Sequence, residues 1–119
     1  MKVQWCWRCN KDVPMLEEHE FAPIQTLHDE LDRALAALEG GGLSGKALSR
    51  QRAALIVRRD RKMMRLYEEV TGVAAEAPYA VIHHRASLYG PACPACGKVL
   101  RTPKASRCYE CGWRRNRSG

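Results

Sequence analysis

The sequence of 119 residues lacks the long apolar run that a membrane-spanning helix needs. No stretch approaches the roughly 20 apolar residues that cross a bilayer. Its first residues, Met-Lys-Val-Gln-Trp-Cys-Trp, also lack the apolar core of a signal peptide. We therefore expect a cytoplasmic protein of bacterial type that has no membrane partner. Hydrophobic residues make up 45% and charged residues 28% of the chain, a composition that excludes disorder throughout.

Common catalytic motifs are missing as well. The run Gly40-Gly41-Gly42 is not followed by the Gly-Lys-Ser/Thr of a phosphate-binding loop. There is no nucleophile elbow, and no pair of carboxylates can be assigned to acid–base catalysis. His83, His84 and Arg85 could serve acid–base or phosphate chemistry, but the sequence positions no partner for them. The absence of these motifs favours a protein that is not an enzyme.

What the sequence does contain is six cysteines arranged as three Cys-x-x-Cys pairs. The pairs are Cys6/Cys9, Cys93/Cys96 and Cys108/Cys111. Two thiolates at this spacing suit a knuckle, a tight turn in which both sulfurs bind one tetrahedral zinc ion. Three disulfides are the alternative in a secreted chain, and the expected cytoplasmic location weakens it because thiols stay reduced there.

The two C-terminal pairs read Cys93-Pro-Ala-Cys96-Gly97 and Cys108-Tyr-Glu-Cys111-Gly112. A glycine after the second cysteine fits a turn with positive φ. Residues 93–112 resemble the short bacterial zinc-ribbon family, in which CPxCG is followed by a brief hairpin and CxxCG. The resemblance implies a small β-hairpin on one structural zinc ion, bound by Cys93, Cys96, Cys108 and Cys111. Four protein ligands leave no position for a catalytic water, and iron in a rubredoxin-like site is the chemical alternative.

Cys6 and Cys9 need two further ligands to complete a tetrahedral site. The candidates are the four histidines, namely His19, His28, His83 and His84. The pair His83-His84 could fold back on the N-terminal knuckle and bind a second zinc ion, although adjacent side chains diverge in most backbone conformations. Trp5-Cys6-Trp7-Arg8-Cys9 also resembles, superficially, the WCxxC of thioredoxin-like proteins, whose fold needs a strand and a helix before the motif. We therefore expect one zinc ion, with a second possible and a redox pair as the alternative.

Between the knuckles, the apolar spacing predicts two helices. A first helix is expected from Pro23, which suits a first turn, to about Glu39, and a second over Gly45–Thr71 that stops at Gly72. The predicted fold is mainly α with a small β part: an antiparallel helical hairpin flanked by an N-terminal Cys-x-x-Cys knuckle and a C-terminal Cys₄ zinc ribbon. We expect a single domain over residues 1–119, divided into the knuckle (1–16), the hairpin (21–72), a connector (73–92) and the ribbon with its basic tail (93–119).

The connector is ambiguous from sequence, because Tyr79–Tyr89 alternates weakly and is also long enough for a short helix. Its stretch from His83 into the ribbon is similar to a group of small bacterial proteins of unassigned role, and that similarity implies no activity. One apolar stripe per helix makes a thin core. We expect a third layer from the knuckles, from the connector or from a second chain, so a homodimer is possible.

The formal net charge of +7 is concentrated in two blocks. Residues 46–65 hold eight basic side chains against one acidic, and residues 98–119 hold seven against one. We expect the acidic first helix to neutralise part of the first block. The second block predicts nucleic-acid binding, because cations release counterions from phosphates and aromatic rings stack on bases. Its candidate residues are Arg101, Lys104, Arg107, Trp113, Arg114, Arg115 and Arg117.

A protein-binding role is the alternative interpretation. A small protein without a catalytic site, carrying a rigid helical arm, suits an adaptor or a neutralising partner of the antitoxin or immunity type. Exposed Trp5 and Trp7 would anchor an acidic protein partner, since tryptophan is common in interface hot spots. These two tryptophans could instead cover the first metal site. The charge supports an acidic partner of either class.

Overall fold

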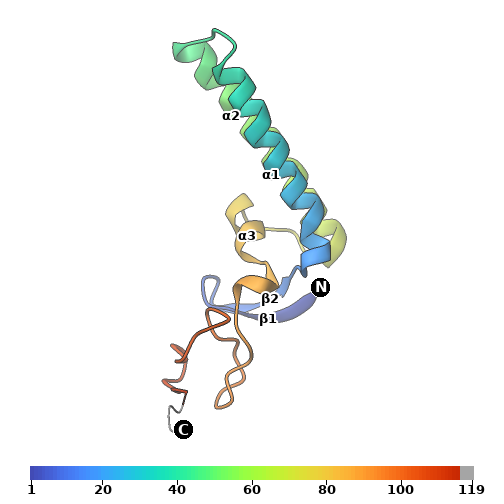
Figure 1. Cartoon of the computed structure of the whole chain (residues 1–119). Helices are drawn as coiled ribbons and strands as arrows, with labels where there is room; N and C mark the ends of the chain where they lie inside the picture. Colours follow the sequence, from blue (N-terminus) through green and yellow to red (C-terminus); the bar gives the residue numbers. More distant parts are fainter. Residues whose placement is uncertain (116–119) are drawn as a thin grey trace.

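Two long helices form an antiparallel hairpin that projects from a small base at one end of the molecule (Figure 1). The structure is a computed structural model that describes residues 1–115. Helix α1 spans Glu18–Glu39 and helix α2 spans Gly45–Thr71. The base contains strands β1 (Lys2–Cys6) and β2 (Lys11–Met15), helix α3 (Pro78–His83), the 3₁₀ helix η1 (Ala86–Leu88) and the ribbon segment. The predicted fold class is confirmed.

Helix α2 has the predicted bounds, whereas α1 begins earlier than expected. Gly72 ends α2 in the left-handed conformation (φ 74°), and its N–H donates to the Glu68 carbonyl at 2.8 Å. The prediction that Pro23 lies in the first turn of α1 is wrong. The Glu20 carboxylate accepts the Glu17 backbone N–H at 2.9 Å and closes the first turn five residues upstream of that proline. Pro23 therefore lies inside the helix, where it removes one backbone hydrogen bond.

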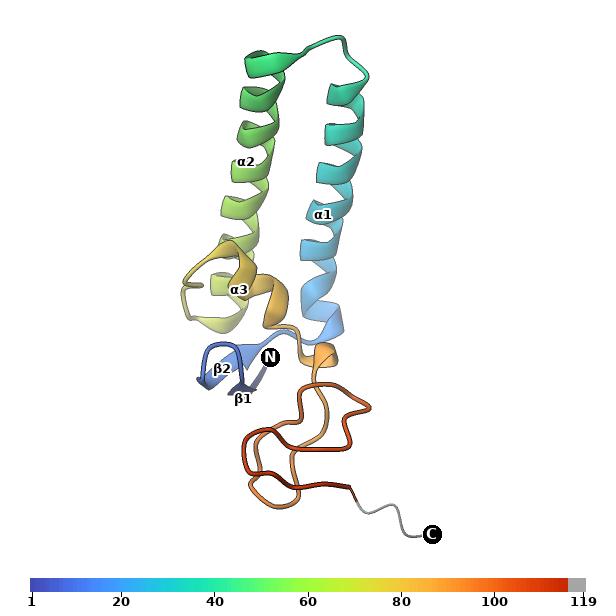
Figure 2. The same ribbon diagram turned by 90° about the vertical axis from the view of Figure 1, so that its left-hand side faces the viewer.

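Most of the apolar core lies where the hairpin meets the base. Its buried side chains come from α1, α2, α3 and the segment after β2: Leu16, Phe21, Ile24, Met63, Tyr67 and Val81. Helix α3 covers one face of the hairpin here (Figure 2), so the connector supplies part of the third layer that the sequence requires. Farther out, no side chain of α1 or α2 between Leu27 and Lys62 is buried. The Cα radius of gyration is 18.3 Å, against about 13–14 Å for a compact chain of this length.

The base is tied together by pairing between segments that are distant in sequence. Strands β1 and β2 form an antiparallel hairpin around the first knuckle, with Gln4 opposite Val13. Leu16 then pairs with the chain after α3: its N–H donates to the His84 carbonyl at 2.8 Å, and its carbonyl accepts the Ala86 N–H at 2.8 Å. This short parallel bridge brings the end of α3 beside the N-terminal knuckle. The connector is thus helical rather than extended over Pro78–His83.

The acidic and basic helices form fewer ion pairs with each other than the sequence suggests. Arg52 of α2 binds Glu39 of α1 at 2.8 Å. Arg59 binds Asp60 of its own helix at 2.9 Å and contacts His28 Nδ1 of α1 at 2.7 Å. Within residues 1–115, no ion pair is found for the other basic residues of α2. A large part of the first basic block is therefore not neutralised by α1.

None of the helices in the described part of the chain has both the length and the apolar character that a membrane crossing requires.

Candidate metal centres

All three Cys-x-x-Cys pairs form the same turn. In each, the residue after the second cysteine has positive φ: 58° at Asn10, 81° at Gly97 and 85° at Gly112. Its N–H donates to the carbonyl of the first cysteine, at 2.8 Å for Asn10, 2.8 Å for Gly97 and 2.9 Å for Gly112. Asparagine tolerates the left-handed conformation better than most residues. Asn10 is therefore the sequence signal, missed above, that groups the N-terminal pair with the two ribbon knuckles.

The ribbon brings Cys93, Cys96, Cys108 and Cys111 together, with their sulfurs within 4.8 Å of one another. The Sγ–Sγ distance is 3.7 Å between Cys93 and Cys111, and 3.7 Å between Cys96 and Cys108. These spacings are too long for disulfides. They match the edge of a tetrahedron of about 3.8 Å that four metal–sulfur bonds of about 2.3 Å define. Two of the six edges thus already have this length, and the four sulfurs lie close enough together to hold a metal ion.

Each ribbon knuckle is closed by its own bridge rather than by one hairpin between them. Ala92 pairs with Val99 across the first knuckle, and Arg107 pairs with Arg114 across the second. The brief hairpin that the family resemblance implies is therefore reduced to isolated bridges. Burial opposes ionisation of Cys93, but the backbone amides of Cys96 and Ala95 outweigh it and lower the Cys93 pKa to about 7. One sulfur is thus partly ionised at neutral pH before a metal binds.

A second cluster joins Cys6 and Cys9 to both adjacent histidines, again with ligand atoms within 4.8 Å of one another. Cys9 Sγ lies 3.4 Å from His83 Nε2 and 3.1 Å from His84 Nε2. The expected divergence of the two side chains is avoided because His83 ends α3 whereas His84 has left the helix (φ −87°, ψ 48°). The two rings meet edge to face, with centroids 4.4 Å apart. The N-terminal β-hairpin and the end of α3 therefore contribute to one Cys₂His₂ cluster.

Two buried tyrosines support these histidines. The Tyr67 hydroxyl donates to the Pro14 carbonyl at 2.6 Å, so its oxygen is free to accept His84 Nδ1–H at 3.2 Å. This arrangement leaves the Nε2 lone pair of His84 facing Cys9, as metal ligation requires. The Tyr89 hydroxyl donates to the His83 carbonyl at 2.6 Å. Neither contact could be inferred from the sequence.

Burial controls the protonation of this cluster. It lowers the pKa of His84 to about 4, with a further effect from His83, and it lowers the pKa of His83. It also raises the pKa of Cys9 to about 11, reinforced by the neighbouring Cys6 thiol. The imidazoles are therefore neutral and ready to donate lone pairs at neutral pH, whereas Cys9 must lose a proton to bind a metal.

The other two histidines do not join this cluster. His28 contacts Arg59 in the helical hairpin. His19 is exposed near the start of α1, beside Glu17 and Glu20. Among residues 1–115 the first Cys-x-x-Cys lies in the turn of the β1–β2 hairpin rather than at the start of a helix, and it faces two imidazoles, an arrangement unlike that of thioredoxin. The geometry therefore favours metal binding over a redox pair.

Cation–π contacts hold the ribbon against the N-terminal knuckle. Lys98 Nζ lies 3.8 Å from the centre of the Trp5 ring, and the Arg101 guanidinium lies 4.3 Å from the Trp7 ring. Arg8 stacks on Trp7 at 4.8 Å. Trp5 and Trp7 are half-buried at this junction. Trp7 packs against the buried cluster that contains Cys6, as the sequence analysis allowed, and both tryptophans contact the ribbon.

The ribbon cations proposed for binding differ in their surroundings. Arg101 is partly engaged, between Trp7 and Tyr109 and 3.8 Å from Glu110. Lys104, Arg107, Arg114 and Arg115 are exposed, and Arg107 stacks on Tyr109 at 4.7 Å. Arg117 lies outside the described residues.

The exposed aromatic ring of the ribbon is that of Tyr109 rather than that of Trp113. Trp113 is half-buried against the cluster of Cys93, Leu100 and Cys108. Tyr109 is 58% exposed. It lines a groove of about 450 Å³ at the junction of the knuckle and the ribbon, together with Trp7, Arg8 and Arg101. Arg8 is a candidate contact that the sequence analysis did not select, because it lies outside both basic blocks.

Comparison of the chain with protein-family models, with curated proteins and with solved structures finds no match.

Proposed function

We propose that this chain is a zinc-stabilised binding module, without enzymatic activity of its own, that contacts nucleic acid at the junction between its N-terminal knuckle and its ribbon. The groove lined by Trp7, Arg8, Arg101 and Tyr109 carries the proposal. Aromatic faces beside guanidinium groups in an open groove are the combination that binds unpaired bases and their phosphates.

Zinc is the metal that suits both sites. Cys₄ and Cys₂His₂ are the usual sets for structural zinc, and four protein ligands complete its preferred tetrahedron. The Cys₂His₂ ligands join the N-terminal hairpin to the end of α3, and the Cys₄ ligands join the two knuckles of the ribbon. The role of the metal is therefore to hold the two walls of the junction groove in place.

The ribbon also carries cations, Lys104, Arg107, Arg114 and Arg115, for which no ion pair is found among residues 1–115. The bridge between Arg107 and Arg114 sets two like charges directly opposite each other, an arrangement that is destabilising in isolation. A phosphate between the two guanidinium groups relieves this repulsion. Lys104 and Arg115 extend the exposed cations on the same segment.

Fluorescence anisotropy with labelled 20-nucleotide oligomers tests the proposal. The metal-loaded chain should bind single-stranded DNA or RNA at 50 mM salt, and its affinity should fall steeply as the salt concentration rises. Tyr109→Ala should weaken binding by about 5- to 150-fold, since one base stack contributes about 1–3 kcal/mol. Arg107→Ala should reduce the salt slope by about 1.

Arg33→Ala is the matched control, because it removes one exposed cation from α1 at a distance from the groove. It should leave both affinity and salt slope almost unchanged. The proposal fails if no oligomer binds at 50 mM salt, or if Arg33→Ala weakens binding as much as Arg107→Ala. A stoichiometric acidic protein that stays bound in a pull-down after nuclease treatment would favour the adaptor or immunity-type role instead.

A further inference from the structure

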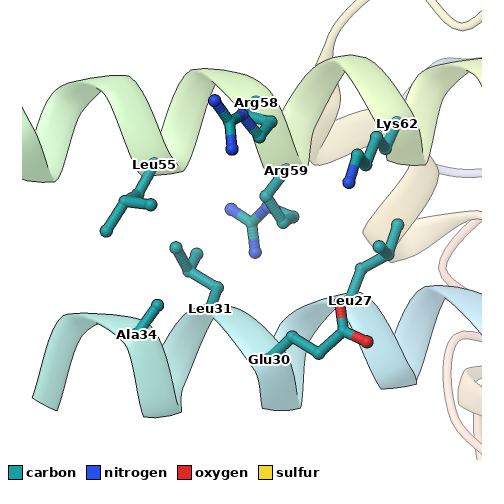
Figure 3. A pocket seen from close by; sticks show the side chains of 8 residues that line it. All are labelled: Leu27, Glu30, Leu31, Ala34, Leu55, Arg58, Arg59 and Lys62. Atoms are coloured by element: carbon teal, nitrogen blue, oxygen red, sulfur yellow. The ribbon is translucent and has the colours of Figure 1, made fainter. Parts of the chain in front are cut away.

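A shallow groove runs between α1 and α2 on the face of the hairpin opposite to α3 (Figure 3). It has a volume of about 190 Å³. Its floor is formed by Leu27, Leu31 and Ala34 of α1 and by Leu55 and Arg59 of α2, all half-buried. Met63 and Tyr67 do not line this groove and pack instead in the core with Val81 of α3. The apolar seam of the hairpin is therefore covered by α3 on one face, near the base, and open on the other.

The rims of this groove carry opposite charges. Glu30 lies on the α1 rim, and Arg58 and Lys62 lie on the α2 rim (Figure 3). The helices repeat the pattern on a larger scale, since α1 has six acidic residues against one basic and α2 has eight basic against three acidic. In the described part of the chain, none of these three rim residues forms an ion pair. The open face thus has a mainly apolar floor, into which Arg59 also points, between an acidic and a basic edge.

We propose that this face binds the same face of a second copy of the chain, so that two hairpins form a four-helix arrangement. A surface that is acidic along one edge and basic along the other is complementary to itself. The proposal is independent of nucleic-acid binding, because it uses the helical arm and not the junction groove.

The charges also select the symmetry of the pair. A two-fold axis parallel to the helices places α1 against the partner's α2, at matching heights along the arm. Glu30 then faces Arg58 of the partner subunit. A two-fold axis across the helices would instead place α1 on α1 and α2 on α2, and would juxtapose like charges. The parallel axis also keeps both metal-binding bases at the same end of the dimer, on the outer faces away from the seam.

The size of the face sets the expected strength. Helix α1 rises about 33 Å, and two helices side by side are about 20 Å wide. The face then offers roughly 650 Å² per protomer, or about 1,300 Å² in total, which is near the lower limit for a stable interface. We expect a concentration-dependent dimer that weakens with salt.

Analytical ultracentrifugation of the nuclease-treated, metal-loaded chain tests the dimer between 1 and about 200 µM. At 50 mM salt the mean mass should rise from 13.4 kDa towards twice that value, and at 500 mM salt the rise should shift to higher concentration. Glu30→Lys and Arg58→Glu should each weaken the dimer by about tenfold, because the two-fold axis counts each change twice. The double variant Glu30→Lys/Arg58→Glu restores opposite charges and should recover most of the loss.

Asp29→Lys is the matched control, since it makes the same charge change one residue away, on a side of α1 that does not line the groove. It should leave the dimer intact, and circular dichroism should show unchanged helicity for all four variants. Three results would overturn the proposal: a mass of 13.4 kDa at every concentration and salt level, a control that dissociates the dimer as strongly as Glu30→Lys, or a dimer that none of the substitutions affects.

Discussion

Replacing Tyr67 with phenylalanine tests whether the histidine cluster is a metal site supported by its surroundings. The substitution removes one hydroxyl and preserves the ring, which is buried with Leu16 and Met63. It leaves the Pro14 carbonyl without its donor at 2.6 Å and His84 Nδ1–H without its acceptor at 3.2 Å.

The expected loss follows from these two contacts. A buried polar group left without its partner costs about 1–3 kcal/mol, so the free energy of unfolding should fall by about that amount. Removal of the hydrogen-bond partner of a metal-bound histidine weakens metal binding by about 10–100-fold. Tyr67→Phe should therefore lower the metal affinity of the Cys₂His₂ site by that factor and leave the ribbon site unchanged.

Chelator competition with zinc, monitored separately for the two sites, measures this effect. Variants that lack the ribbon cysteines isolate the Cys₂His₂ site. Tyr79→Phe is the matched control, because Tyr79 is 68% exposed and its hydroxyl has no hydrogen-bond partner among residues 1–115. Equal zinc affinity in wild type and Tyr67→Phe would refute the role assigned to Tyr67.

Two further predictions concern packing and pH. Gly90→Ala should lower the free energy of unfolding, measured by denaturant titration, by about 1–3 kcal/mol, because the added Cβ would overlap the Thr102 carbonyl oxygen. Gly40→Ala is the control, since its Cβ would meet only ordinary contacts, and it should leave the free energy of unfolding almost unchanged. Equal effects of the two would contradict the close approach. Zinc affinity should fall by at least about tenfold for each pH unit below neutrality, because Cys9, with a pKa of about 11, must release a proton when the metal binds. Protons compete with zinc for His84 only near pH 4, since the pKa of this histidine is about 4. A zinc affinity that does not change with pH would contradict this account.

The parts of the fold predicted from sequence are those set by local signals. Helix α2 was predicted correctly because the left-handed Gly72 and a long apolar period define it without tertiary help. The start of α1 was missed because the contact between Glu17 and Glu20 competes with the usual preference of proline for a first turn. The grouping of the six cysteines follows from spacing alone.

The parts that could not be predicted depend on contacts between distant segments. His83 and His84 meet the first knuckle because Leu16 pairs with the chain after α3, a contact that leaves no periodic signal in the sequence. The same is true of the contact between the ribbon and the N-terminal knuckle, where Arg101 lies on Trp7. The sequence analysis assigned Arg101 to partner binding, whereas in the structure its guanidinium also contacts Trp7 and Tyr109 of the same chain.

Metal content is the most direct test of the central claim, that two metal ions hold the base together. The purified, reduced chain should contain two zinc ions by native mass spectrometry and elemental analysis. The double variant Cys6→Ser/Cys9→Ser should retain one zinc ion. Its melting temperature should be lower than that of the wild-type chain, because no metal then joins the N-terminal β-hairpin to the end of α3. One zinc ion or none in the wild-type chain, or two in the double variant, would contradict the account.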